Sequence, residues 1–197
     1  MILGSTFGFF YQEGREYILD INSVQHILFI IAVSAIYLPK DWRKVSIILL
    51  SFTFGFTISL SLAANNVFRI NYDIIEYLIP VTIFVTAFSN VLKKQNTYHT
   101  RKLQSNYFFA LIFGIIHGFG FSKYLKNLIV DAPSFKQIFA YVLGLEVAHL
   151  IVVLLFLVIS YIFVNIINVS RRDWNLIISS AIAGIAMTIM FETRYWI

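Results

Sequence analysis

Residues 113–121 read FGIIHGFGF, which places His117 in the middle of a run that otherwise has the character of a membrane span. A bilayer interior penalises ionisable groups, so an imidazole at this depth is either neutral and tolerated or is required for function. The rest of the chain helps to decide between these two interpretations.

The composition indicates an integral membrane protein. Of 197 residues, 59% are hydrophobic and only 13% are charged, and a soluble domain of this length needs a more polar surface. The net charge of +5 comes from short basic clusters between apolar runs, a pattern that fits lipid headgroups and excludes a nucleic-acid partner. Because the chain has no cysteine, any metal would be held by nitrogen and oxygen ligands.

The apolar segments predict an all-α, polytopic transmembrane helical bundle that forms a single domain over residues 1–197. A helix of about 20 residues crosses the hydrocarbon core, and spanning backbone must be internally hydrogen-bonded. Six spans are expected, at about 22–38, 45–64, 73–92, 106–125, 137–168 and 174–193.

Basic residues orient the bundle. The loops after the first, third and fifth spans hold nine of the fifteen Lys and Arg residues, so the positive-inside rule places both termini outside. These nine are Lys40, Arg43, Lys44, Lys93, Lys94, Arg101, Lys102, Arg171 and Arg172. Two spans also carry small residues four apart, which favours close packing of helix backbones: Ser51, Gly55 and Ser59 in one, and Gly114, Gly118 and Ser122 in the other.

Ionisable residues inside the spans suggest a metal site. Glu146 and His149 are three residues apart, so they share a helix face and can hold one divalent cation. His117 is the natural third ligand and His26 a further one. Such donors suit zinc, nickel, copper or iron more than magnesium or calcium. The structural alternative is that each histidine only bonds a neighbouring helix, although a carboxylate at this depth costs about 3 kcal/mol on insertion scales.

Other polar residues are expected to line a pathway or support the ligands. Thr53, Thr57 and Ser61 repeat every four residues, and such a stripe either lines a wet path or bonds back to its own helix. The full set of pathway or supporting residues is Gln25, Thr53, Thr57, Asn65, Asn66 and Ser122.

Five stretches resemble the HupE/UreJ family of bacterial membrane proteins in order and spacing. They are VQHILFI (24–30), SFTFGFTISLSLA (51–63), FGIIHGFGF (113–121), GLEVAHL (144–150) and FETRYW (191–196). The resemblance implies a multi-pass protein of the bacterial inner membrane that handles nickel or cobalt, and it marks His26, His117 and Glu146 as metal-handling positions.

The chain departs from the family pattern at two positions. Gln25 stands where relatives typically have an aspartate, and Phe56 where they typically have a histidine. His149 stands where many relatives have glutamine, which adds a donor. The resemblance therefore implies a divergent member whose cargo is nickel, cobalt or zinc.

Three functions remain open from the sequence. The first is a permease for a divalent transition metal, bound in the outer half of the bundle. The second is an intramembrane zinc hydrolase that acts on a lipid or lipidated substrate. The third is an assembly subunit whose polar residues only hold helices together. The expected partners are membrane lipids and a metal ion, with a second copy of the chain or accessory subunits as open alternatives.

Overall fold

Every regular element in the described part of the chain is a helix. The computed structural model describes residues 6–19, 24–67, 70–93, 103–128 and 133–193. The elements are α1 (Thr6–Leu19), α2 (Val24–Ser34), η2 (Pro39–Asp41), α3 (Trp42–Ala64), α4 (Tyr72–Val91), α5 (Leu103–Leu128), α6 (Phe135–Tyr161), η4 (Ile162–Ile166) and α7 (Arg171–Glu192). The loop residues Lys94, Arg101 and Lys102, used above for orientation, lie outside the described residues.

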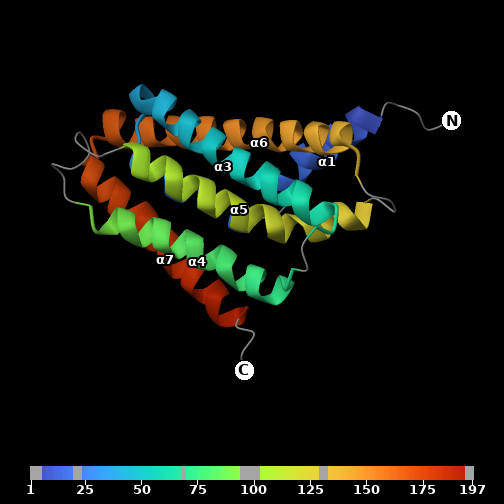
Figure 1. Cartoon of the computed structure of the whole chain (residues 1–197). Coiled ribbons are helices and arrows are strands. Elements are labelled where there is room, and N and C mark those ends of the chain that lie inside the picture. Colours follow the sequence, from blue (N-terminus) through green and yellow to red (C-terminus); the bar gives the residue numbers. More distant parts are fainter. Residues whose placement is uncertain (1–5, 20–23, 68–69, 94–102, 129–132, 194–197) are drawn as a thin grey trace.

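Five of these helices are long and apolar enough to cross a membrane. They lie at Pro39–Ala64, Tyr72–Val91, Asn106–Leu128, Phe135–Ile166 and Arg171–Glu192, within a few residues of the last five expected spans. The chain is therefore a multi-pass membrane protein. Figure 1 shows α4 and α7 along the lower side of the bundle, below α3, α5 and α6.

The first expected span differs from the observed helix. Instead of one helix over 22–38, the structure has the short apolar helix α2, whose 11 residues are about 17 Å long. The chain turns after Ser34, whose carbonyl accepts a hydrogen bond from the Tyr37 amide at 2.9 Å. A single crossing by this helix is excluded, because a hydrocarbon core is about 30 Å thick.

Helix α1 was not expected from the sequence, because it mixes Gln, Glu and Arg with its aromatic residues. It packs directly on the backbone of α6. A Cβ atom on Gly14 would lie 2.0 Å from the Tyr141 carbonyl oxygen, and one on Gly144 would lie 2.0 Å from that of Tyr11. Two glycines therefore let α1 and α6 touch at the backbone.

The close packing expected at each small-residue stripe is observed, and the structure shows that the two stripes, on α3 and α5, pack against each other. A Cβ atom on Gly55 would lie 2.2 Å from the carbonyl oxygen of Leu111, and one on Gly114 would lie 2.1 Å from that of Phe52. A Cβ atom on Gly118 would lie 2.2 Å from the Ser59 hydroxyl oxygen and 2.4 Å from the Phe56 carbonyl oxygen. This contact fixes the rotation of α5 against α3.

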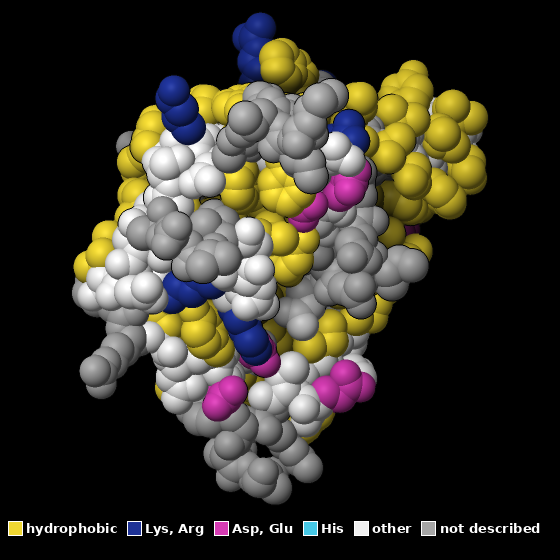
Figure 2. Space-filling view, turned by 90° about the vertical axis from the view of Figure 1, so that its right-hand side faces the viewer, with side chains coloured by type: hydrophobic (Ala, Val, Ile, Leu, Met, Phe, Trp, Pro, Cys, Tyr) yellow, Lys and Arg dark blue, Asp and Glu magenta, His cyan; other side chains and the backbone are white. Residues whose placement is uncertain are grey.

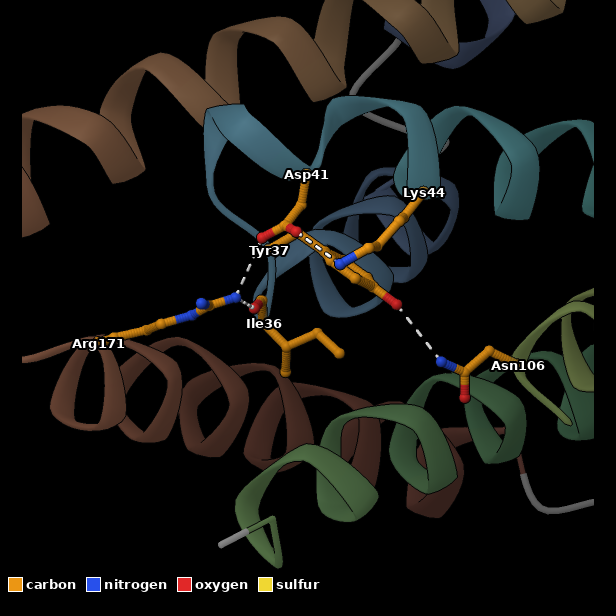
Figure 3. Close-up of polar contacts among 6 residues, drawn as sticks. All are labelled: Ile36, Tyr37, Asp41, Lys44, Asn106 and Arg171. Atoms are coloured by element: carbon orange, nitrogen blue, oxygen red, sulfur yellow. Dashed lines mark hydrogen bonds and ion pairs between the residues drawn. The ribbon is translucent and has the colours of Figure 1, made fainter. Parts of the chain in front are cut away.

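A polar network joins the turn after α2 to the starts of α3 and α7 (Figure 3). The Arg171 guanidinium donates to the Ile36 carbonyl oxygen at 2.6 Å and lies 3.3 Å from a carboxylate oxygen of Asp41. The other oxygen of Asp41 accepts from Lys44 at 2.8 Å. Two basic residues of the expected cytoplasmic loops thus hold one end of the bundle together.

Adding a methyl group at the α3–α5 contact should destabilise the protein. Gly55→Ala and Gly114→Ala would each drive a Cβ atom into a backbone carbonyl, at a cost of about 1–3 kcal/mol. Gly184→Ala is the matched control, because its Cβ would meet nothing within 4 Å. The measurement is the thermal unfolding temperature in detergent. Equal unfolding temperatures for all three variants would contradict the backbone contact.

Candidate functional site

Three histidines from three helices lie together inside the bundle. The ring of His26, on α2, lies 4.9 Å from that of His117, on α5, and 6.4 Å from that of His149, on α6, between centroids. His26 is 5% exposed, and His117 and His149 are fully buried. The structure thus brings together imidazoles that are up to 123 residues apart, since 149 − 26 = 123.

Aromatic rings enclose this histidine cluster, which consists of His26, His117 and His149. Phe52 on α3 contacts all three imidazoles, at centroid distances from 5.3 to 6.4 Å. Phe121 and Phe56 lie 5.1 and 6.2 Å from the His26 ring, and Phe29 lies 4.9 Å from His117. The apolar shell keeps water away from most of the cluster.

Most ring nitrogens of the cluster have no hydrogen-bond partner among the described residues. The unpartnered atoms are Nε2 of His26, Nδ1 of His117 and both nitrogens of His149. By contrast, Nε2 of His117 lies 2.9 Å from the Thr82 hydroxyl on α4, and Nδ1 of His149, although not hydrogen-bonded, has the Glu146 carboxylate 3.6 Å away. Buried polar atoms are nearly always paired, and an unpaired one costs about 1–3 kcal/mol. Three neighbouring rings therefore present nitrogen atoms that are available to a bound ligand or to water.

Glu146 lies at the edge of the cluster. Its side chain is 14% exposed, and one carboxylate oxygen lies 3.6 Å from Nδ1 of His149. The same oxygen accepts a hydrogen bond from the Thr53 hydroxyl on α3. The expectation that Glu146 and His149 share a helix face is therefore confirmed.

The described residues do not form a finished coordination sphere. No group of three or more His, Asp or Glu side chains among them stands where it could hold a metal ion. The ring centroids are 4.9 and 6.4 Å apart, but the nitrogen and oxygen donors of a zinc-like site must all come within about 2.0–2.2 Å of one ion. The donors are neighbours that have to reorient before they can act as ligands.

A cavity of about 310 Å³ leads from the surface to His26, and we call it the vestibule. At its mouth, the exposed side chains of Lys123 and Glu76 form an ion pair at 3.0 Å. Its lining comprises Tyr17, Gln25, His26, Glu76, Ile79, Gly120, Phe121, Lys123, Tyr124 and Asn127. Figure 2 views this end of the bundle, where basic and acidic side chains lie close together and no described imidazole is visible.

The structure separates the expected pathway residues into two groups. Gln25 lines the vestibule and Thr53 contacts Glu146. By contrast, the Thr57 hydroxyl donates to the Thr53 carbonyl and the Asn65 amide to the Ser61 carbonyl, both on their own helix.

The remaining two expected residues have structural partners. Asn66, with a φ of 56°, adopts a left-handed turn conformation and accepts a hydrogen bond from Lys126 at 2.7 Å. Ser122 is buried against Tyr72 and donates to the Phe119 carbonyl.

Sequence reasoning missed three residues of the site. Thr82 is the hydroxyl partner of His117, and the Thr82–Thr86 spacing of four residues was an available signal for it. Tyr17 lies 6.3 Å from the His26 ring and Phe29 lies 4.9 Å from the His117 ring. Neither aromatic residue carries a sequence signal that distinguishes it from ordinary core residues.

Comparison with known proteins gives one match. The family model described as HupE / UreJ protein matches residues 2–195, nearly the whole chain, and this confirms the family resemblance seen in the sequence. No curated protein and no solved structure matches the chain.

Removing the Thr53 hydroxyl should destabilise the protein more than removing that of Thr57. Thr53→Val deletes an interhelical hydrogen bond to a carboxylate, worth about 1.5–3 kcal/mol. Thr57→Val, one turn away, deletes only a bond to its own helix. Unfolding temperatures in detergent, with and without Glu146→Gln, are the measurement. If Thr53→Val costs as much in the Glu146→Gln background as alone, the Thr53–Glu146 contact contributes nothing.

Proposed function

The chain belongs to the HupE/UreJ family, and on that premise we propose that it is a membrane permease for a divalent transition metal ion. The cargo is nickel or cobalt in the first instance, with zinc as the alternative. His26, His117, Glu146 and His149 form the binding group. The family supports nickel- or cobalt-related membrane transport in general, and the site chemistry supports these four residues in particular.

One observation carries the proposal: buried imidazoles from α2, α5 and α6 lie together with unpartnered nitrogens. Neutral imidazole with a carboxylate is a donor set for nickel, cobalt and zinc, not for magnesium or calcium. The vestibule reaches from the surface to His26, so an ion can reach this residue without crossing lipid. A loosely arranged ligand set also suits a carrier, since a transported ion must be released.

The two departures from the family pattern fall beside this cluster. Phe56, where relatives typically have a histidine, lies 6.2 Å from the His26 ring and is fully buried. Gln25, where relatives typically have an aspartate, lines the vestibule. Both changes remove a donor or a charge next to the binding group, which supports a metal preference different from that of typical members.

The proposed topology has six crossings, with both termini outside and the chain in a bacterial inner membrane. Helices α1 and α2 share the first crossing. Glu13 on α1 accepts a hydrogen bond from Tyr124, near the end of α5, whereas Tyr37, after α2, accepts one from Asn106 near its start. The 14 and 11 residues of the two helices are together about 38 Å long, enough to cross the hydrocarbon core.

The intramembrane hydrolase is less well supported. A metal-bound water needs a general base beside it, and Glu146 is the carboxylate that contacts the cluster, through His149. It would have to act both as ligand and as base. Stoichiometric bound metal without any uptake into vesicles would nevertheless favour this enzyme over the permease.

Metal binding and uptake should both depend on the cluster. Purified protein in detergent is titrated with Ni²⁺, Co²⁺ and Zn²⁺, and uptake is measured in proteoliposomes. His117→Ala and Glu146→Gln should each weaken binding by about tenfold or more, at least as much as loss of a supporting contact costs. Glu16→Gln, on the exposed face of α1, is the matched control. Unchanged affinity in the cluster variants would refute the proposed ligands.

Restoring an imidazole at position 56 should strengthen metal binding. Phe56→His adds a nitrogen donor next to His26, and we expect Ni²⁺ affinity to rise by about tenfold, the lower range for a supporting group at a metal site. Phe54→His is the control, because Phe54 lies on the same helix with its side chain exposed on the outside of the bundle. A gain in both variants would show that an added histidine binds metal wherever it stands.

A further inference from the structure

A second cavity lies on the other side of the histidine cluster. It has a volume of about 320 Å³, and we call it the distal cavity. Its lining comprises Phe29, Val33, Ile36, Tyr37, Ile48, Val85, Thr86, Ser89, Asn90, Lys93, Asn106, Phe109, Ala110 and Phe113. It shares no lining residue with the vestibule.

The two cavities follow the same three helices in opposite directions. On α5 the vestibule is lined by residues in 120–127 and the distal cavity by residues in 106–113. On α4 the corresponding ranges are 76–79 and 85–90, and on α2 they are 25–26 and 29–33. The cavities therefore lie end to end along the α2–α4–α5 interface.

The segment between the cavities, which we call the barrier, includes the side chains of His117, Thr82 and Phe29. His117 and Thr82 lie in the gaps between the two ranges on α5 and α4, and they contact each other at 2.9 Å. Phe29, 1% exposed, covers His117 from the distal side and lines the distal cavity itself. His26, which lines the vestibule, meets His117 from the other side. His117 therefore lies between the two cavities along α5.

Polar groups continue beyond this barrier along one face of α4. Thr86, Ser89 and Asn90 follow Thr82 at helical spacing, and all three line the distal cavity. At its far end the Tyr37 hydroxyl accepts a hydrogen bond from Asn106 (Figure 3). Lys93 also lines the cavity and donates to Asn90. An ammonium group lowers the affinity of this space for a cation, which suits release of the ion and not storage.

We propose that the distal cavity is the release chamber for the transported cation and that Phe29, with the His117–Thr82 pair, is the gate between it and the vestibule. This inference rests on the proposed function and adds the route that the cation takes from the vestibule to the distal cavity. The ion moves along the α2–α4–α5 interface, where both cavities lie, and not along the hydroxyl stripe of α3, whose Thr57 and Ser61 line neither cavity.

Cysteine labelling tests the route without relying on transport. Because the chain has no cysteine, single variants report access directly. In proteoliposomes of known orientation, a charged, membrane-impermeant thiol reagent should label Gln25→Cys from one side only and Ser89→Cys from the opposite side only. Adding Phe29→Ala to Ser89→Cys should open access from the Gln25 side as well. The matched control is Phe52→Ala, which also removes a buried ring beside His117 but lines neither cavity.

The gate is refuted if Ser89→Cys is labelled from both sides in the otherwise unchanged chain. It is also refuted if Phe29→Ala leaves the labelling unchanged, or if Phe52→Ala opens the same access. Phe29→Leu keeps an apolar side chain in place and should preserve one-sided labelling. It shows whether labelling in Phe29→Ala results from the lost side chain or from a general loss of structure. If labelling follows the expectation while vesicles take up no metal, the route stands and the metal-permease function fails.

A second measurement separates binding from release. Ser89→Trp fills the distal cavity, so it should abolish Ni²⁺ uptake while leaving Ni²⁺ binding to the purified protein unchanged. Phe88→Trp, at the adjacent exposed position, should leave both unchanged. Normal uptake by Ser89→Trp would show that the ion leaves by another route, even if metal binding at the cluster is confirmed.

Discussion

Backbone-to-backbone contact between helices fixes where the functional side chains lie. Gly114 and Gly118 hold α5 against the carbonyl oxygens of α3, and Gly144 holds α6 against that of Tyr11 on α1. His117 lies between the first two glycines, and His149 lies five residues after the third. Because side chains cannot intervene at these contacts, the helices cannot rotate without collision. The directions of both imidazoles are therefore set by glycines, which have no side chain.

The cluster that results is costly for the folded protein. Three ring nitrogens, Nε2 of His26, Nδ1 of His117 and Nε2 of His149, have neither a hydrogen-bond nor an ion-pair partner among the described residues, and each would cost about 1–3 kcal/mol if it stayed so. Replacing such a group with an apolar one is often neutral or stabilising, so a cluster kept only for stability would be better built from leucine. This cost is the physical argument behind the binding group proposed above.

The sequence predicted the long helices well because uninterrupted apolar runs have few alternatives in lipid. It predicted that Glu146 and His149 share a face, since their spacing alone decides this. It could not predict α1, which is buried by contact of Gly14 with another helix and not by its hydropathy. It also could not rank two similar hydroxyl stripes. Thr57 and Thr86 both donate to a carbonyl of their own helix, but Thr86 also lines the distal cavity. Spacing shows which residues share a face but not what that face meets.

The same contacts divide the bundle into a tightly joined part and a looser one. Glycines join α3 to α5 and α1 to α6 at the backbone, whereas both cavities lie along the faces of α4. Pro80 lies inside α4, two residues before Thr82. A proline removes one backbone hydrogen bond and weakens the preceding turn, so α4 has its weakest point beside the barrier. If the proposed gate opens by bending of α4 at Pro80, Thr82 separates from His117 while α3, α5, α1 and α6 keep their backbone contacts.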